Sequence, residues 1–159
     1  AQLSYANNFK WAVSGGEDRY RRGMYTFFKR TSPHPNLITF DCPDSNVTCV
    51  KRNISNTPIA ALATLNNSVF TDAAKAMAKR LIKERNSDTE RIAMGFQLCT
   101  ARKPSTKEAA AFLALLKKAK LYYGENETEA KAFNGDAEAS AWATLTRIFL
   151  NLDEFITRE

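Results

Sequence analysis

A series of helix-start signals, which recurs from residue 57 to the end of the chain, constrains the fold more than any other feature. Pro58 follows Thr57, and threonine caps a helix well while proline at the first helical position loses no hydrogen bond. Ser87 and Ser105 each precede a glutamate by three residues, the capping-box spacing that satisfies free N–H groups of a first turn. These signals predict that the second half of the chain is a succession of helices.

Apolar residues recur at helical spacing after each signal, so each helix is expected to bury one face. Helices are expected to begin near residues 57, 69, 87 and 105, and a last helix is expected to end near residue 152. The polar residues 125–136 are expected to form a connector. The predicted inward stripes consist of Phe70, Ala73, Ala74, Met77, Leu81, Ile92, Phe96, Cys99, Phe112, Leu115, Leu116, Ala119, Tyr122, Trp142, Leu145, Ile148, Phe149 and Leu152.

The N-terminal part offers one more helix, which is expected over residues 17–30. Tyr20, Met24 and Phe27 recur there at helical spacing and are predicted to form a core stripe. Arg22 and Lys29 fall on another face, about two turns apart. There they either bind an anionic partner or remain solvated.

The segment after residue 30 is expected to be irregular, because Pro33 and Pro35 exclude a regular helix. His34, between them, is expected in an exposed, extended turn. Residues 47–52 alternate apolar and polar side chains, which fits a short strand without an obvious partner. The predicted fold is mainly α, with about six helices in a single bundle-like domain and one irregular segment at about residues 31–56.

The composition is typical of one globular domain. A chain of 159 residues with 44% hydrophobic content buries roughly 70% of its unfolded surface. No membrane span is expected, since no apolar run approaches about 20 residues, and the N-terminus does not resemble a signal peptide. The chain begins with Ala1, and we expect a piece of a longer protein. Residues 1–16 are predicted to be an extension or linker from a preceding domain, and residues 17–159 the helical domain.

The formal net charge of +6 is concentrated in residues 19–52, which carry seven basic and two acidic residues. Such a cluster suits nucleic acid, an anionic ligand or an acidic neighbouring domain, and it equally suits a solvated face with internal ion pairs. The basic residues are not interleaved with exposed aromatic residues, and no helix-turn-helix or RNP pattern occurs. Nucleic acid is therefore not expected as a partner.

Residue types that carry catalysis or bind metals are sparse. Cys42, Cys49 and Cys99 fit neither a zinc site nor a haem-attachment motif, and the chain has a single histidine. We therefore expect neither a metal site nor a histidine-bearing triad. The sequence contains no self-contained catalytic motif, so it does not establish whether the chain is part of an enzyme.

Four motifs together resemble one family in order and spacing. They are YRRGMYTFFKRTSPHP, FDCPDSNVTCVKR, SNTPIAALATLNN and AWATLTRIFLNLDEFITRE. From about Trp11 to Glu159, the chain resembles the planctomycete-type C-terminal domain of unknown function 1553. It departs from that family at Ala60, where the family has glutamine, and at Thr48 and Cys49, whose order is reversed.

The resemblance implies a context rather than an activity. Such domains close large exported bacterial proteins, often with a c-type cytochrome domain at the front, so the resemblance implies a periplasmic or secreted location. Any haem c then belongs to another domain or chain. No cofactor is expected within this chain.

Two functions fit this context. The chain either contributes a basic and polar site for an anionic or carbohydrate ligand to a periplasmic, oxidoreductase-like assembly, or it is a non-catalytic interaction domain that docks a neighbouring domain or partner chain through its basic face. Asp41 is the carboxylate placed to act as a base, and it equally suits a structural ion pair with Arg30 or Arg52. The candidate ligand-binding residues are Arg22, Tyr25, Lys29, Arg30, Arg52 and Asn56.

Cys42 and Cys49 are predicted to form a disulfide. Only six residues separate them, the implied compartment is oxidising, and Cys99 is expected inside a helix. In the chain-entropy description, so short a loop adds about 2 kcal/mol of stability, which strain can cancel.

Overall fold

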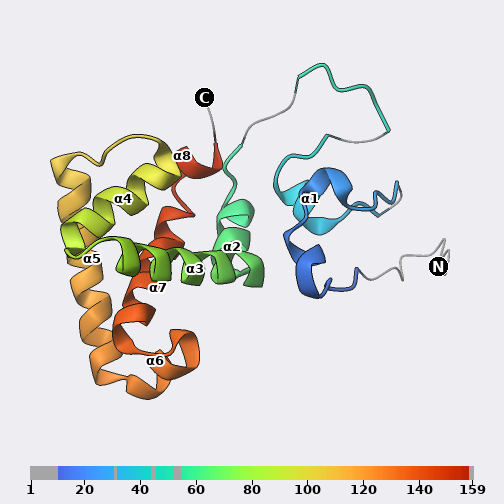
Figure 1. Cartoon of the computed structure of the whole chain (residues 1–159). Helices are drawn as coiled ribbons and strands as arrows, with labels where there is room; N and C mark the ends of the chain where they lie inside the picture. The colour runs from blue at the N-terminus through green and yellow to red at the C-terminus, as the bar shows by residue number, and fades with distance from the viewer. Residues whose placement is uncertain (1–10, 31, 44–45, 52–54, 158–159) are drawn as a thin grey trace. The chain divides into compact units, whose positions relative to one another are not determined.

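The structure is a computed structural model, and it describes residues 11–30, 32–43, 46–51 and 55–157 (Figure 1). These residues form eight α-helices and two short 3-10 helices and contain no strand. The predicted mainly α fold is confirmed. The predicted strand is wrong for residues 47–51, because no described segment offers a strand to pair with them.

The chain divides into two compact units, Ala1–Ala63 and Thr64–Glu159. Helix α2 (Pro58–Asn66) contains the boundary between them. The predicted boundary after residue 16 stays a prediction, because residues 1–10 lie outside the described part of the chain. Among the described residues, no helix is long and apolar enough to cross a membrane.

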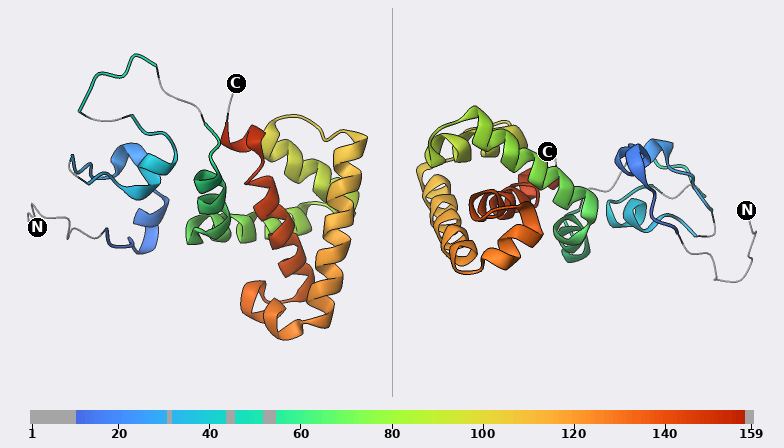
Figure 2. Two further views of the ribbon diagram at one scale, coloured as in Figure 1. Left: turned by 180° about the vertical axis from the view of Figure 1, so that it is seen from behind. Right: turned by 60° about the horizontal axis from the view of Figure 1, so that its bottom comes forward.

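Helix α7 (Ala137–Phe149) is the centre of the second unit (Figures 1 and 2). The short helix α8 (Asp153–Ile156) follows it and contacts α4. Four helices pack around α7, and they are α3 (Ser68–Glu84), α4 (Asp88–Thr100), α5 (Thr106–Glu125) and α6 (Glu127–Asn134).

Aromatic side chains form the middle of this core. Trp142 and Phe149 of α7 are fully buried. The ring centroids of Phe96, Phe112 and Phe149 lie 5.0 to 6.4 Å apart, in tilted and edge-to-face arrangements. Since burying each such side chain contributes about 1.5–3 kcal/mol, this cluster is a main source of stability. The predicted inward positions are confirmed for these four residues.

The predicted stripe of α5 is only partly right. Phe112 and Leu116 are buried as expected, but Leu115 and Tyr122 are 41% and 48% exposed. The buried face of α5 is therefore narrower than its sequence indicates.

The two capping boxes that the sequence predicts are present. The Oγ atoms of Ser87 and Ser105 accept from the main-chain N–H groups of Glu90 and Glu108, each at 3.3 Å. The glutamate carboxylates accept in return from the main-chain N–H groups of the two serines, at 3.4 and 2.7 Å. These bonds fix the first residues of α4 and α5, which is why both helices begin where the sequence indicates.

The prediction that residues 125–136 form a polar connector is wrong, because Glu127–Asn134 is helix α6. Lys131 and Glu127 form an i,i+4 ion pair on its outer face. Ala130 is buried, and its carbonyl oxygen accepts from the Ser140 hydroxyl of α7 at 2.8 Å. Phe133 of the same helix packs against the core, and its ring is stacked on that of Tyr123 with centroids 6.1 Å apart. Two core contacts within eight residues are too few to stand out as a hydrophobic stripe in the sequence.

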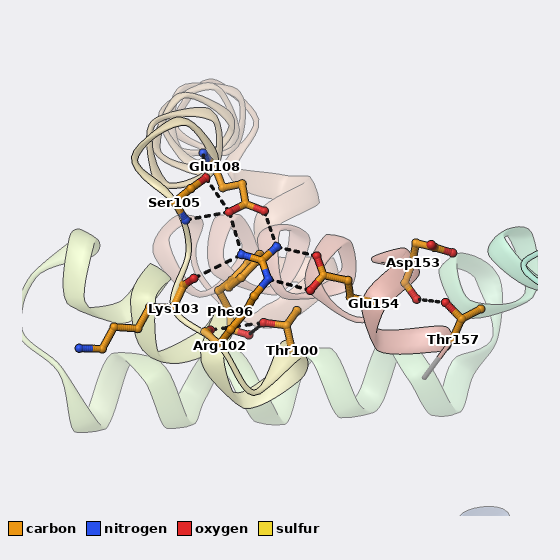
Figure 3. A network of polar contacts seen from close by, with 9 residues as sticks. All are labelled: Phe96, Thr100, Arg102, Lys103, Ser105, Glu108, Asp153, Glu154 and Thr157. Carbon is orange, nitrogen blue, oxygen red and sulfur yellow. Dashed lines mark hydrogen bonds and ion pairs between the residues drawn. The ribbon is translucent and has the colours of Figure 1, made fainter. Parts of the chain in front are cut away.

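Arg102, between α4 and α5, ties three parts of the second unit together (Figure 3). Its Nη2 lies 2.7 Å from Glu108 Oε1 of α5 and 2.5 Å from Glu154 Oε1 of α8. The guanidinium carbon lies 4.7 Å from the ring centroid of Phe96. Because arginine binds carboxylates in a fixed planar geometry, this Arg102 clasp holds α8 to the start of α5.

The predicted helix over residues 17–30 is wrong. Its residues form two 3-10 helices, η1 (Gly16–Tyr20) and η2 (Gly23–Tyr25). Between them Arg21 and Arg22 are extended, with ψ angles of 141° and 144°. Gly23, which lies inside the predicted range, disfavours one continuous helix.

Helix α1 (Pro35–Thr39) corrects the expectation that the prolines exclude a helix here. Pro35 occupies the first turn, where its missing N–H costs nothing. His34 caps the helix, because its Nδ1 accepts from the Asn36 main-chain N–H at 3.2 Å. His34 is half-buried rather than exposed, and its ring centroid lies 4.9 Å from that of Trp11.

The core stripe predicted for residues 17–30 is also wrong. Tyr20, Met24 and Phe27 are 58%, 73% and 70% exposed. Without a continuous helix these side chains do not share one face, and no described residue from 11 to 59 is buried. The described part of the first unit therefore has no hydrophobic core of its own.

Candidate functional site

The predicted basic residues make local contacts in the first unit. The Arg22 Nη2 donates to the Tyr25 hydroxyl at 3.2 Å, and its guanidinium carbon lies 5.5 Å from the centre of the tyrosine ring. The Arg30 Nε donates to the Asn46 side-chain oxygen, 16 residues further on. Lys29 is half-buried. Arg22 and Tyr25, two of the candidate ligand-binding residues, therefore contact each other. Arg30, a third candidate, is bonded to the irregular segment.

Asp41 fastens the irregular segment. Its Oδ2 accepts from the Ser55 main-chain N–H at 2.9 Å and from the Ser55 hydroxyl at 2.6 Å. Its backbone is left-handed, with φ of 53°, a conformation that aspartate tolerates better than most residues. These bonds give Asp41 a structural contact with Ser55, which differs from the expected ion pair with Arg30 or Arg52. Arg52, one of its two expected ion-pair partners, lies outside the described residues.

A hollow of about 690 Å³ lies beside Asp41 in the first unit, within the usual range of ligand pockets. Among the predicted site residues it brings together Asp41, Cys42 and Cys49. Arg22, Tyr25, Lys29, Arg30 and Asn56 are not among its described lining residues. The lining consists of Phe28, Pro33, Leu37, Ile38, Asp41, Cys42, Pro43, Asn46, Val47, Thr48, Cys49, Val50 and Lys51.

Sequence reasoning missed the apolar lining as part of a site. Leu37 and Ile38 belong to α1, while Val47 and Val50 follow in the irregular segment. The sequence did contain a signal for this lining. Apolar residues in a stretch that is expected to be irregular do not belong to the buried face of a predicted helix or strand, so they are free to line a pocket. The alternation of apolar and polar residues in 47–52 favoured a strand for Val47 and Val50 instead.

Gly23 packs closely against the side chain of Leu37. A Cβ atom on Gly23 would lie only 2.8 Å from the Leu37 Cδ2 atom, so glycine permits this close approach of η2 to α1. One wall of the hollow thus depends on a residue of the preceding 3-10 helix.

The cysteines are free thiols in this structure. The Cys49 thiol donates to the Lys51 carbonyl oxygen at 3.2 Å, and both Cys42 and Cys49 line the hollow. Their disulfide stays a prediction. Cys99 packs against the core of the second unit, and burial raises the pKa of its thiol to about 11.

Exposed apolar side chains gather in the first unit. Among the residues that the structure describes, it contains ten of the fourteen large hydrophobic residues that are exposed, although it has fewer than half of the chain. The ten are Val13, Tyr20, Met24, Tyr25, Phe27, Ile38, Val47, Val50, Ile59 and Leu62. Exposed apolar side chains that lie together in one contiguous patch are typical of sites that bind another protein.

The site thus offers apolar contacts, charged groups and two free thiols. The Asp41 carboxylate is engaged by Ser55, and its neighbours in the lining include one lysine. Among the described residues, no group of three or more His, Cys, Asp and Glu side chains is arranged to hold a metal ion.

One comparison with known proteins gives a match. The model of a family described as "PSD1: Protein of unknown function (DUF1553)" matches residues 2–116. This range contains the first unit and the second unit as far as the middle of α5. No curated protein and no solved structure matches the chain.

Proposed function

The chain belongs to the PSD1 family of unknown function, DUF1553, and we propose that it is a non-catalytic interaction domain whose first unit docks a neighbouring domain or a partner chain. The sequence resemblance supports a larger, exported, cytochrome-c-linked bacterial protein as the context. In that context the haem c belongs to another domain or chain, and the docking takes place outside the cytoplasm.

The exposed apolar side chains of the first unit carry this proposal. Met24 and Phe27 are 73% and 70% exposed, and Val50 is 99% exposed. Leaving such side chains in water forgoes about 1.5–3 kcal/mol each relative to burial. A segment that buries none of its described residues between 11 and 59 gains this free energy only when something covers it.

The charge of the first unit indicates what covers it. Residues 19–52 carry seven basic and two acidic residues, so an acidic surface is attracted and a basic one is repelled. Arg21 is already paired with Asp18, at 2.5 Å, but the excess of positive charge remains. The partner expected here is a protein surface with apolar residues surrounded by carboxylates.

Hydroxyl-radical footprinting of the intact protein, compared with residues 1–159 alone, tests the proposal. Met24 and Phe27 are expected to be oxidised readily in the isolated chain and to be protected in the intact protein or its complex. Leu121, which is 65% exposed on α5, provides an internal reference for radical dose. Equal oxidation of Met24 and Phe27 in the two samples refutes docking through the first unit.

Variants sharpen the same test. Met24→Ser together with Phe27→Ser removes apolar contact area without disturbing a buried core, because both side chains are exposed. Because the variant lacks both reporter side chains, protection is read at the neighbouring Tyr20 and Tyr25, which are 58% and 59% exposed in the isolated chain. We expect the double variant to lose the protection of these two tyrosines. The matched control Leu121→Ser changes an equally exposed side chain of the second unit and is expected to keep it.

A second function is supported by the hollow beside Asp41. A volume of about 690 Å³ with both a carboxylate and Lys51 in its wall suits a small polar ligand, such as a carbohydrate, in an oxidoreductase-like assembly. Under this hypothesis Asp41→Ala and Lys51→Ala, which change two lining residues of the hollow, lower turnover or ligand binding in the intact protein while the fold is retained. Unchanged turnover and binding in both variants remove this candidate.

A further inference from the structure

We infer that the hollow of the first unit is the seat of an acidic, apolar segment of the docking partner, with apolar side chains entering the hollow and carboxylates meeting Lys51 and Arg30. The inference rests on the proposed docking function and names the place and the chemistry of the contact. The partner segment is identified by alternating carboxylate and aliphatic side chains.

The walls of the hollow provide the apolar contact. Phe28 and Leu37 are half-buried and form part of the wall, whereas Ile38 and Val50 are 60% and 99% exposed and remain to be covered. The wall is preorganised on the α1 side, because Leu37 lies against Gly23. Binding at a preformed wall loses less conformational entropy than binding at a mobile one.

The charges around the hollow are arranged for an anionic partner. Lys51 lies in the wall, and the Arg30 guanidinium is anchored at the edge by its bond to Asn46, another lining residue. That bond uses one of five guanidinium N–H donors. The carboxylate of Asp41 is turned to the Ser55 N–H and hydroxyl, which reduces its repulsion of an incoming anion.

The lining favours a protein segment over nucleic acid. Phe28 is the one aromatic residue among the described lining residues, whereas proteins that bind single strands stack successive bases on several aromatic rings. The aliphatic lining, which includes Leu37, Val47 and Val50, matches leucine-like side chains. A nucleic acid offers the negative charge but no aliphatic groups for these walls.

Fluorescence anisotropy with the full chain tests the inference directly. The probe is a fluorescein-labelled peptide of alternating leucine and glutamate residues. Two comparison probes are the same peptide with lysine in place of glutamate and a labelled oligo(dT) of the same charge. We expect the glutamate peptide to bind, the lysine peptide not to bind, and the oligo(dT) to bind more weakly.

Variants of the hollow decide where the peptide binds. Lys51→Glu is expected to lower the affinity for the glutamate peptide about fivefold. The double variant Ile38→Ser with Val50→Ser is expected to lower it about tenfold or more. The controls Lys83→Glu and Leu121→Ser change exposed residues of the second unit and are expected to leave the affinity unchanged. Circular dichroism and thermal unfolding verify that every variant keeps its helices.

Three outcomes overturn the inference. They are equal binding of the lysine peptide, tighter binding of oligo(dT), and affinities that the hollow variants leave unchanged. The proposed docking function fails separately, in the footprinting of Met24 and Phe27. If those two side chains are protected but the hollow variants bind the peptide normally, docking stands and its seat lies elsewhere on the first unit.

Discussion

Ala101 ends helix α4 in the left-handed conformation, with φ of 60°, and its N–H donates to the Gln97 carbonyl oxygen at 2.9 Å. This is the position where helices most often have glycine, since a Cβ atom is strained there. The adjacent Arg102 begins the clasp, so the strained turn also directs the arginine toward α5 and α8.

Replacing Ala101 with glycine is expected to stabilise the protein. Relief of the left-handed strain is partly offset by the greater flexibility of glycine when unfolded, and the net gain is about 0.5–1 kcal/mol. Urea unfolding followed by circular dichroism measures it. In the control Ala110→Gly, an exposed position inside α5, the same change is expected to cost about 0.5–1 kcal/mol. A loss of stability in Ala101→Gly contradicts the strain argument.

The thiols of Cys49 and Cys99 are expected to differ in reactivity. Burial raises the pKa of Cys99 to about 11, so little thiolate forms at pH 8, whereas Cys49 is exposed. Because the thiolate is the nucleophile, iodoacetamide is expected to modify Cys49 at least about tenfold faster than Cys99. Peptide mass spectrometry after timed quenching measures the rates, and equal rates contradict the prediction.

The predicted Cys42–Cys49 disulfide is tested in separate samples that have not been alkylated. Oxidised glutathione accepts two electrons and becomes two reduced glutathione molecules as the two thiols lose their protons and join. We expect non-reducing mass spectrometry to show a linkage between Cys42 and Cys49. Two unlinked thiols at these positions after equilibration show that the bridge does not form.

At the scale of elements, helices α3, α4 and α7 meet at Gly95. A Cβ atom placed there would lie 2.7 Å from Phe149 Cε2 and 2.9 Å from Leu81 Cδ1. Both neighbours are fully buried, so neither side chain has space to move away. The absence of a side chain at Gly95 therefore sets how closely these helices approach.

Gly95→Ala is expected to destabilise the protein by about 1–3 kcal/mol through overpacking. The matched control is Gly124→Ala near the end of α5, where an added Cβ meets nothing within 4 Å. That variant is expected to gain about 0.5–1 kcal/mol from better helix propensity. Thermal or urea unfolding distinguishes the two, and a Gly95→Ala protein as stable as the wild type contradicts the close packing.

Element prediction succeeded where the signals are local. The capping boxes at Ser87 and Ser105 gave the starts of α4 and α5, because a cap depends on residues three apart. It failed for α6, a short helix that packs on the core through only Ala130 and Phe133 among polar neighbours. Element prediction failed also for residues 17–30. Most of the stability of a helix in a protein comes from packing its apolar face against a core, and the described part of the first unit has no such core.

At the scale of the whole molecule, the Arg102 clasp makes stability depend on acid pH. Hydrogen bonds from Arg102 and Ser105 lower the pKa of Glu108 from 4.5 to about 2, and a hydrogen bond from Arg102 lowers the pKa of Glu154. Since both pKa values are lower in the folded state, the contribution is complete above about pH 4.5. It is lost as the pH falls from there toward 2.

Arg102→Gln is therefore expected to lower the melting temperature at pH 6 to 7 and to have little effect near pH 2. Hydrogen exchange of residues 153–157 at neutral pH is expected to increase in this variant, because α8 loses its tie to α5. The control Arg80→Gln removes an i,i+4 pair on α3 and is expected to leave that exchange unchanged. A melting-temperature difference that is constant from pH 7 to pH 2 contradicts the clasp.

Candidate-site prediction succeeded less well than fold prediction. The sequence singled out Asp41, Cys42 and Cys49, which the structure places around one hollow. It did not indicate that Ser55 engages Asp41, because these residues are 14 positions apart in an irregular segment.

The sequence by itself determined the mainly α fold, the starts of the capped helices and the inward aromatic residues of α4, α5 and α7. These depend on contacts between residues a few positions apart and on the burial of apolar periodicity. Only the tertiary structure decided the Arg102 clasp, in which Arg102 and Glu154 are 52 residues apart, and the hollow of the first unit. It also decided that Tyr20, Met24 and Phe27 are exposed, because whether an apolar side chain is buried depends on what packs against it.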